Sequence, residues 1–507
     1  MKVDIIGAGV AGLSAGCYLQ MNGIGTTIYE TQHRPGGLCT SWTRGEYTFD
    51  GCLHWLLGSG SASPFYKLWS ELLDMDSIRF VNHDLRVDIG TRDHADKYGD
   101  RVFHLYTNVK RLEAYMLDIA PEDKRSIKKF ISSIRTIQKY EVPPAITTAL
   151  QIQPWYKKIG MIKFLPMLFF LMRWNKITNF SFAEELQNPF LKESFRLLFD
   201  AENTHLLVMT MPLAFYDRNG AGYPLGGSFA FAKKIEEKYL ALGGKIHYGK
   251  AVQKIITDNG TAQGLLLTDG TQTRADIVIS AADWHFTLFK ALEGKFVNKK
   301  ILQLDNLEKY KIYYSVLLVS LGINRSINNL PHFFRFPLEK NLVSPDGTVY
   351  ERLEAHIYNY DPTLAPEGKT VVAASFYTTN AAYWINLRET DREKYKEVKE
   401  AFAREVTALL DKKMGDITAH VEECDVATPA TYHRYTGNRL GSVQGWLPGK
   451  NIVEMSQVEM ELPGLKNFYY AGHWTQVGGG LPVAIKSARD VAQVICHRNK
   501  IKFKTQL

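Results

Sequence analysis

Hydrophobic positions follow two different patterns along this chain of 507 residues. Residues 1–60, about 220–290 and about 420–497 carry short Val- and Ile-rich runs bounded by glycine-rich turns, which is typical of β-strands. Within residues 244–283, Asn-Gly and Asp-Gly pairs separate such runs and indicate hairpin turns. We therefore expect the three stretches to form one discontinuous α/β domain.

The intervening stretches have a helical pattern. Apolar residues recur there at helical spacing, as in residues 111–120 and 392–410, together with some β runs such as 313–323. These parts predict an inserted α+β substrate domain with a helical lid region. The expected boundaries are 1–61, 220–294 and 420–497 for the first domain, 62–219 and 295–419 for the inserted segments, and 498–507 for a basic C-terminal tail.

Composition narrows the class of protein. With 45% hydrophobic and 22% charged residues, the chain has the composition of a globular protein with room for a buried cofactor. Five scattered cysteines argue against a disulfide framework or a metal site, so we expect a cytoplasmic protein without an export signal. A net charge of +8 without a dense basic stripe argues against nucleic acid as a partner.

The N-terminal glycines carry the first chemical signal. Gly7, Gly9 and Gly12 form a GxGxxG motif between an apolar strand and a small-residue helix, and Glu30 ends the next strand. Gly7 permits the tight turn, Gly9 lets the backbone approach a pyrophosphate, and Gly12 allows close helix packing. Glu30 would accept ribose hydroxyls and disfavour a 2′-phosphate. For the glycines alone, a turn without a ligand is the alternative.

Two further glycine-rich turns bear on which dinucleotide is expected. Gly36 and Gly37 can lie along the same pyrophosphate with Arg34 as an added cation, although such a pair is also an ordinary turn. Residues 469–485 then repeat the strand, glycine turn and helix of the N-terminus. A nicotinamide enzyme needs only the first motif, so the three together favour one larger ligand held from both ends of the chain.

The chain resembles the phytoene desaturase-like FAD-dependent oxidoreductases, which are related to flavin amine oxidases, through six segments in this order: GAGVAGL, RPGGL, GEYTFDGCLH, YPLGGS, ADIVISAADW and YYAGHWTQVGGGLPVAIKSAR. The resemblance is distributed over most of the chain and is weak in the inserted segments. It implies a Rossmann-like FAD-binding domain that holds FAD noncovalently, with both glycine turns contacting one cofactor.

The resemblance also implies which residues surround the FAD. The N-terminal glycines would hold the pyrophosphate, Val252 would meet the adenine through its backbone, and the helix starting near Leu481 would direct its positive end to the flavin edge that becomes anionic on reduction. The implied FAD-binding residues are Gly7, Gly9, Val10, Ala11, Gly12, Glu30, Arg34, Gly36, Gly37, Leu38, His54, Val252, Ala281, Gly472, His473, Gly480, Leu481 and Ala484.

Candidate catalytic residues follow from the same resemblance. The FDGCLHW stretch makes His54 and Trp55 the side chains expected nearest the flavin, and Tyr223 and His473 belong to other matching segments. We expect His54, Tyr223 and His473 to serve catalysis. The alternative for both histidines is that they only pack against the cofactor and hydrogen-bond to it, because hydride transfer needs positioning more than side-chain chemistry.

Residues 155–176 suggest a membrane surface as a further partner. Five cations and no acid surround an apolar run there that is too short to span a bilayer; the cations are Lys157, Lys158, Lys163, Arg173 and Lys176. With Trp155 and Trp174 this is typical of an interfacial anchor, which would make the protein peripheral at the membrane, and a buried lid helix is the alternative. Neither this stretch nor residues 205–216 offers the arginines expected for a carboxylate substrate, so a long hydrocarbon fits better.

We therefore expect an FAD-dependent oxidoreductase that transfers hydride between flavin N5 and a carbon of a hydrophobic, isoprenoid- or polyene-like substrate. Desaturation, saturation and flavin-dependent isomerisation would all use the same residues, so the direction stays open. A flavin amine oxidase is one alternative, although the helix start GGGLPVAI lacks the acid of those enzymes. A non-catalytic, FAD-containing protein that binds lipid at a membrane surface is the other.

Overall fold

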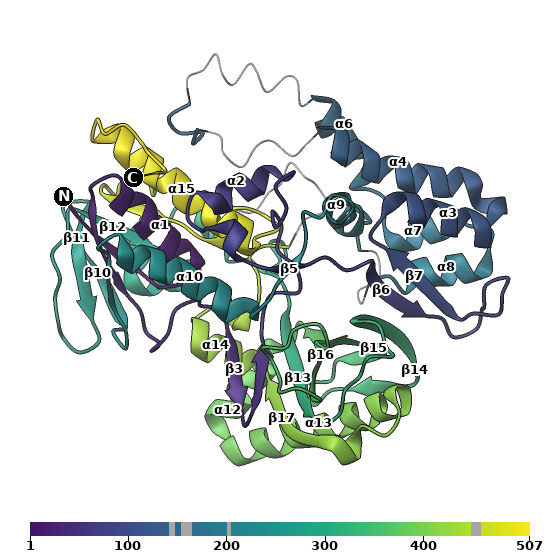
Figure 1. Ribbon diagram of the computed structural model, residues 1–507. Coiled ribbons are helices and arrows are strands. Elements are labelled where there is room, and N and C mark those ends of the chain that lie inside the picture. The colour runs from purple at the N-terminus through teal and green to yellow at the C-terminus, as the bar shows by residue number, and fades with distance from the viewer. Residues whose placement is uncertain (141–147, 154–164, 200–203, 448–457, 507) are drawn as a thin grey trace.

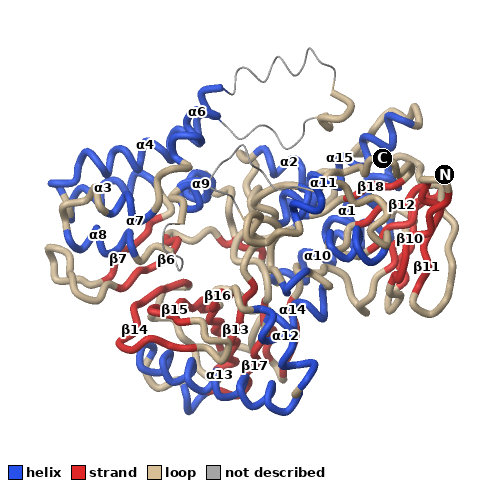
Figure 2. Tube along the Cα trace, turned by 180° about the vertical axis from the view of Figure 1, so that it is seen from behind, coloured by secondary structure: helices blue, strands red, loops and turns tan. Residues whose placement is uncertain are grey.

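A five-stranded parallel sheet forms the centre of one half of the molecule (Figures 1 and 2). The computed structural model describes residues 1–140, 148–153, 165–199, 204–447 and 458–506. The strand order is β18-β12-β1-β2-β9, and these strands are β18 (Phe468–Tyr470), β12 (Ile277–Ser280), β1 (Lys2–Ile6), β2 (Gly25–Tyr29) and β9 (Lys245–His247). The sheet thus joins segments that lie far apart in the sequence.

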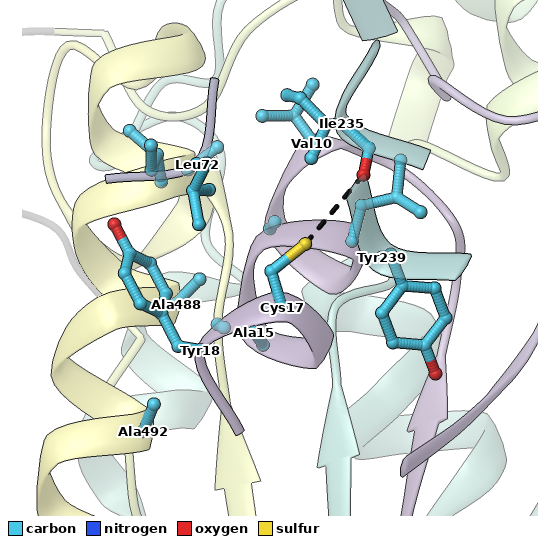
Figure 3. Close-up of a cluster of buried hydrophobic side chains, with 14 of the residues drawn as sticks. Val10, Ala15, Cys17, Tyr18, Leu72, Ile235, Tyr239, Ala488 and Ala492 are labelled. Carbon is cyan, nitrogen blue, oxygen red and sulfur yellow. Dashed lines mark hydrogen bonds between the residues drawn. The ribbon is translucent and has the colours of Figure 1, made fainter. Parts of the chain in front are cut away.

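Three helices pack closely beside this sheet. Helix α1 (Val10–Met21) lies between α10 (Gly227–Ala241) and α15 (Gly480–Arg498), as Figure 3 shows for the side chains around Cys17. The Cys17 thiol donates a hydrogen bond to the Ile235 carbonyl at 3.7 Å, and burial raises the pKa of that thiol to about 12. Small residues of α1 and α15 let the first and last helices of the chain approach closely.

The hairpin predicted within residues 244–283 is present. Strands β10 (Val252–Asp258) and β11 (Thr261–Leu267) pair antiparallel around Asn259 and Gly260, which both have positive φ angles. The helix predicted near Leu481 is also present, as α15. The basic tail folds back onto α1, where the Lys504 amide donates to the Asn22 side chain at 2.8 Å.

A seven-stranded mixed sheet dominates the other half. Its order is β17-β13-β16-β15-β14-β6-β7, comprising β17 (Val421–Ala427), β13 (Ser315–Ile323), β16 (Thr370–Thr378), β15 (Val349–Ile357), β14 (Phe333–Val343), β6 (Leu85–Gly90) and β7 (Val102–Tyr106). Most of these strands lie where the pattern suggested helices. Strand β17 follows the boundary expected at residue 420 and pairs with β13.

Alternation along these strands gives the second sheet two different faces. On β13, Leu317 and Val319 pack with α13 (Arg392–Met414), whereas Val316 and Leu318 face Tyr47 and other residues near the first half. The period of two in a strand sends successive side chains to opposite faces. One face is therefore covered by helices, and the other is available to build a site against the first half.

The remaining elements complete the two halves. A bundle beside β6 and β7 contains α3 (Val109–Ile119), α4 (Lys124–Tyr140), α6 (Leu165–Trp174), α7 (Asn179–Ala183), α8 (Pro189–Arg196) and α9 (Leu207–Tyr216) (Figure 1). Elsewhere lie α2 (Pro64–Ser70), α11 (Lys299–Leu304), α12 (Ala381–Thr390), α14 (Pro429–Thr436), β3 (Ser41–Arg44), β4 (Tyr47–Asp50), β5 (Phe80–Val81) and β8 (Tyr223–Pro224). Within the described ranges, no helix is long and apolar enough to cross a membrane.

Candidate active site

The two later glycines of the N-terminal turn are required for different reasons. A Cβ atom on Gly12 would lie 2.0 Å from the Gly7 carbonyl oxygen, so helix packing alone requires glycine there. A Cβ atom on Gly9 would find its nearest described neighbour, the Gly36 carbonyl oxygen, at 4.0 Å. The protein fold therefore leaves space at Gly9, as the approach of a pyrophosphate requires.

Glu30 lies where β2 ends, next to this turn. Its carboxylate accepts hydrogen bonds from the Ala8 amide at 2.6 Å and the Gln32 amide at 2.8 Å. Burial raises the pKa of Glu30, while these backbone donors oppose the shift. Each carboxylate oxygen has a further lone pair, so Glu30 can still accept from the two hydroxyls of a ribose.

The second glycine turn packs directly against the first. The Gly36 amide donates to the Ala8 carbonyl at 2.9 Å, and Gly36 and Gly37 both have positive φ angles. Leu38 follows and packs partly buried. The Arg34 guanidinium lies 4.0 Å from the Phe229 ring centre, and its buried Nε has no hydrogen-bond partner among the described residues.

The C-terminal turn reaches the same place. The Ala281 amide donates to the Ile6 carbonyl, and the Ala471 amide donates to the Ser280 carbonyl, both at 2.9 Å. A Cβ atom on Gly472 would lie 4.0 Å from the Ala11 side chain. Backbone from three distant segments thus meets at the carboxyl ends of three neighbouring parallel strands, which is where open α/β sheets bind ligands.

Helix α15 begins beside this edge. Gly478, Gly479 and Gly480 all have positive φ angles, and a Cβ atom on Gly479 would lie 2.8 Å from the Gly445 amide nitrogen. The half-buried Leu481 and buried Ala484 occupy the first turns. Because the first N–H groups of a helix lack intrahelical partners, this end carries partial positive charge.

Val252 lies close to the Glu30 end of the site. The Lys250 amide donates to the Glu30 carbonyl at 2.8 Å, and β10 begins two residues later at Val252. Val252 is buried, with 7% of its surface exposed. Its backbone is therefore positioned on the side of the site where Glu30 would hold a ribose.

A buried aspartate joins two of the matching segments. Asp50 accepts hydrogen bonds from the amides of Cys52 and Leu53 and from both the amide and the hydroxyl of Ser228. Burial raises the pKa of Asp50 to about 6, against the effect of these donors. The loop that carries His54 is thereby fixed to the start of α10.

The three expected catalytic residues fall into two groups. The His54 Nδ1 lies 3.4 Å from the Tyr358 hydroxyl, and the Tyr223 ring packs against Tyr358 at 6.1 Å, so the first two share a neighbour. His473 instead packs on Trp474 at the C-terminal turn. Burial lowers the pKa of His473 to about 4, and the pKa of His54 to about the same value with help from the Arg86 charge.

Two of these side chains retain hydrogen-bonding capacity. The Nε2 atom of His473 and the hydroxyl of Tyr223 are buried and have no partner among the described residues. Buried polar groups are normally satisfied, so each can accept a hydrogen bond from a bound group or donate one to it. Together with the space at Gly9 and the free Nε of Arg34, the free His473 atom fits a bound FAD.

The structure adds residues that sequence reasoning missed. His54 stacks on His356 of β15 at 3.9 Å between ring centres, and His83 stacks on His332 at 3.5 Å. Arg86 of β6 lies 5.2 Å from the Phe333 ring centre, beside these histidines. Polar residues at alternating positions, such as His356 and Tyr358, were the available signal, but alternation does not say which residues of other strands meet them.

Fold and site together define a dinucleotide-binding flavoprotein. The model of the family described as flavin-containing amine oxidoreductase matches residues 10–496. The chain belongs to this family, and it is an FAD-dependent oxidoreductase.

Several curated proteins are similar over most of the chain. A 4,4′-diapophytoene desaturase from a Methylomonas species is 24% identical and covers 99% of this chain and 96% of its own. The phytoene desaturase (lycopene-forming) of Pseudescherichia vulneris is 23% identical, covering 97% and 99%. The prolycopene isomerase of Daucus carota is 25% identical, covering 86% and 71%. The resemblance to the phytoene desaturase-like FAD-dependent oxidoreductases is confirmed.

Solved structures show the same fold. An oxidoreductase from Methanosarcina mazei has a TM-score of 0.59 at 16% identity and covers 98% of this chain and 100% of its own. A triple mutant of putrescine oxidase has a TM-score of 0.59 at 12% identity and covers 98% and 99%. At such identities the likeness concerns the fold alone. The expected α/β class with a Rossmann-like FAD-binding part is confirmed.

Proposed function

We propose that the protein uses FAD to move hydride to or from a carbon of a hydrophobic, polyene- or isoprenoid-like substrate. The observation that carries this proposal is the convergence of three backbone turns at one sheet edge, with His54 placed between that edge and the second sheet. The names of the curated relatives, which refer to carotenoid desaturation and isomerisation, support the substrate class.

We further propose that the segments expected at 1–61, 220–294 and 420–497 form the FAD-binding domain, apart from β17, which belongs to the second sheet. Bound FAD would supply the hydride acceptor and donor. The chain would hold its pyrophosphate with the backbone at Gly9 and Gly36, and its ribose with Glu30. The positive end of α15 would stabilise negative charge that develops on the bound ring.

We assign His54, Tyr223 and His473 to the face beside the reacting atoms. With pKa values of about 4, both imidazoles are neutral at pH 7, so each can donate one hydrogen bond and accept another. Tyr223 has a pKa raised by burial and stays protonated. These groups can orient a substrate or transfer a proton without introducing charge into an apolar site.

FAD retention and substrate-dependent reduction test the proposal. Purified protein should be yellow, and acid should release FAD. Gly9→Val should lose FAD while keeping the fold, because a side chain would fill the space now left at Gly9.

Anaerobic mixing with phytoene in detergent should bleach the flavin, and the reduced protein should be assayed for saturation or isomerisation of a polyene. The proposal would be refuted if phytoene does not reduce the flavin and the reduced protein neither saturates nor isomerises a polyene.

A flavin amine oxidase is the second candidate, because the matched family bears that description. Hydrogen peroxide release with putrescine, without reaction with any polyene, would favour it.

We also propose that the region around α6 binds a membrane surface. Four apolar side chains of this helix are exposed, with 66% of the surface of Phe169 accessible; the others are Leu165, Leu168 and Met172. Arg173 and Lys176 are exposed beside them. Residues 155–164 of the expected anchor, which include Trp155, Lys157, Lys158 and Lys163, lie outside the described residues. Trp174, expected at the interface, is instead buried in the core of the helical bundle.

Sedimentation with anionic liposomes tests this contact. A double variant, Leu168→Ser and Phe169→Ser, should bind at least several-fold more weakly, because it removes apolar surface that would enter the interface. Ser substitution of the exposed Leu302 on α11 is the matched control. Equal sedimentation of all three proteins would leave α6 as a lid helix.

A further inference from the structure

Arg86 holds an unusual position in the second sheet. Its half-buried guanidinium lies between two rings, 5.2 Å from the centre of Phe333 and 5.7 Å from that of Tyr216. Among the described residues it makes no ion pair and no hydrogen bond, and its recorded contacts are with these two rings. Cations in such partly buried places are normally paired, because loss of water without a partner is costly.

Four histidines surround this arginine. His54 stacks on His356, which stacks in turn on Phe333 at 3.9 Å, and His83 stacks on His332. We call Arg86 and these four histidines the Arg86 cluster. Burial is the main cause that lowers the pKa of each histidine, and the Arg86 charge contributes in all four cases. At pH 7 the cluster therefore consists of one permanent cation and neutral imidazoles.

The cluster also offers free hydrogen-bonding atoms. The buried His83 Nε2 has no partner among the described residues, and neither has the Tyr223 hydroxyl. Tyr360 links the two, because its ring lies edge-on to His83 at 4.4 Å and to Tyr223 at 5.2 Å. The free Nε2 atom of His83 thus belongs to the same cluster as the unpaired charge.

We propose that Arg86 binds a carboxylate group of the substrate, so that this site takes an apolar chain ending in an acid rather than a pure hydrocarbon. This inference rests on the proposed function, because it places that carboxylate beside His54. A hydrocarbon would cover the guanidinium and remove its water without replacing the lost hydrogen bonds. A carboxylate can accept two parallel N–H bonds from arginine.

The charge balance favours a monoanion. A phosphate ester carries nearly two negative charges at pH 7, and the described part of the cluster supplies one cation. The sequence expectation of a pure hydrocarbon came from residues 155–176 and 205–216, which do not include Arg86. The strand pairing of β6 with β14 brings Arg86 to the site.

Calorimetric titration of the FAD-loaded protein with decanoate and with decan-1-ol tests this proposal. The two probes share the chain and differ in the acid. Wild type should bind decanoate about tenfold or more tightly than decanol, because hydrogen bonds between charged partners are the strong ones. Arg86→Gln should abolish that preference, and Arg86→Lys should keep part of it.

Two control variants exclude binding elsewhere. Arg111→Gln removes an exposed arginine that also lies over a ring, 3.9 Å from the centre of Tyr106, and Arg173→Gln removes a cation beside the exposed apolar side chains of α6. Both should keep the wild-type preference. If Arg86→Gln fails to fold or to hold FAD, the same titration is made with Arg86→Met, which keeps the contacts with the rings and should also lose the preference for decanoate.

Equal affinity of wild type for decanoate and decanol would overturn the proposal, as would a preference that survives removal of the Arg86 charge. These failures differ from failure of the proposed function. A flavin that reacts with a polyene hydrocarbon while the protein ignores decanoate refutes the carboxylate site alone. Arg86-dependent decanoate binding to a protein whose flavin never reacts supports the site and refutes the proposed reaction.

Discussion

The two halves of this protein build their parts of the site by different means. The first half uses backbone: glycines at strand ends, amides that meet carbonyls, and the start of α15. The second half uses side chains, with His356 and Arg86 brought together from different strands. Backbone geometry at a strand end demands glycine at set spacings, whereas a side-chain cluster needs only the correct alternation on each strand.

The largest expected effect is the loss of stability when a glycine required by packing is replaced, compared with a glycine that leaves space for a ligand. Gly12→Val should destabilise folding by about 4 kcal/mol or more, because its Cβ would lie 2.0 Å from a backbone oxygen that cannot move easily. Gly9→Ala should leave thermal unfolding of the FAD-free protein nearly unchanged. Thermal unfolding and released FAD, measured together, check the distinction. An apoprotein equally stable in both variants would contradict it.

The next effect concerns a buried ion pair that holds the ends of the chain together. Arg489 of α15 donates to both carboxylate oxygens of Glu71 at 2.7 and 2.9 Å, and the Tyr18 hydroxyl donates to the same group at 2.8 Å. Glu71→Ala should cost about 3 kcal/mol, because a buried arginine loses its anion. Denaturant unfolding measures this cost.

The exposed Arg498–Glu461 pair is the matched control, with 51% and 32% of the side-chain surfaces accessible. Glu461→Ala should cost less than about 1 kcal/mol. Similar losses in the two variants would mean that Glu71 does not act as a buried anchor.

Acidification should destabilise the protein through its buried histidines. His54 and His83 have pKa values lowered to about 4, so between pH 6.5 and 5.5 the unfolded chain binds protons that the folded chain excludes. As the pH is lowered from 6.5 to 5.5, the free energy of unfolding should therefore decrease, by about 1 kcal/mol per buried histidine at most. Asp50, whose pKa is raised to about 6, opposes this trend, as do other buried carboxyls with raised pKa values such as Glu30.

Thermal unfolding at intervals of pH measures this dependence. His332→Asn should flatten the curve, because the pKa of His332 is lowered to about 2 by burial and by neighbouring His83. A curve that is level from pH 6.5 to 5.5 in the wild-type protein would show that the histidines are not buried in solution.

The smallest effect tests whether His54 belongs with the cofactor or with the substrate. His54→Ala should retain FAD, because the described contacts of His54 are with His356 and Tyr358 rather than with the glycine turns. The rate of flavin reduction by substrate should fall by about tenfold, a modest value for a residue that positions or transfers a proton. Loss of FAD with an unchanged rate in the remaining holoprotein would reverse the assignment.

Local signals predicted the elements of the first half well. The turn at Asn259 and Gly260 and the start of α15 both occur where the residues indicated. Much of the second sheet was interpreted as helical, because β14 and β15 mix apolar residues with charged ones at their exposed ends. Their partner strands are distant in the sequence, and the residues of a single strand do not identify the strand with which it pairs.

The sequence by itself therefore determined the cofactor class and the places where the backbone must turn, because glycine is required at positive φ and at close backbone approach. Only the tertiary structure decided that Gly9 leaves space which packing does not need, that Asp50 fixes the His54 loop, and that an unpaired Arg86 lies among neutral histidines. Such facts depend on which strands pair and in what register, and register is set by the burial of whole faces rather than by any local residue.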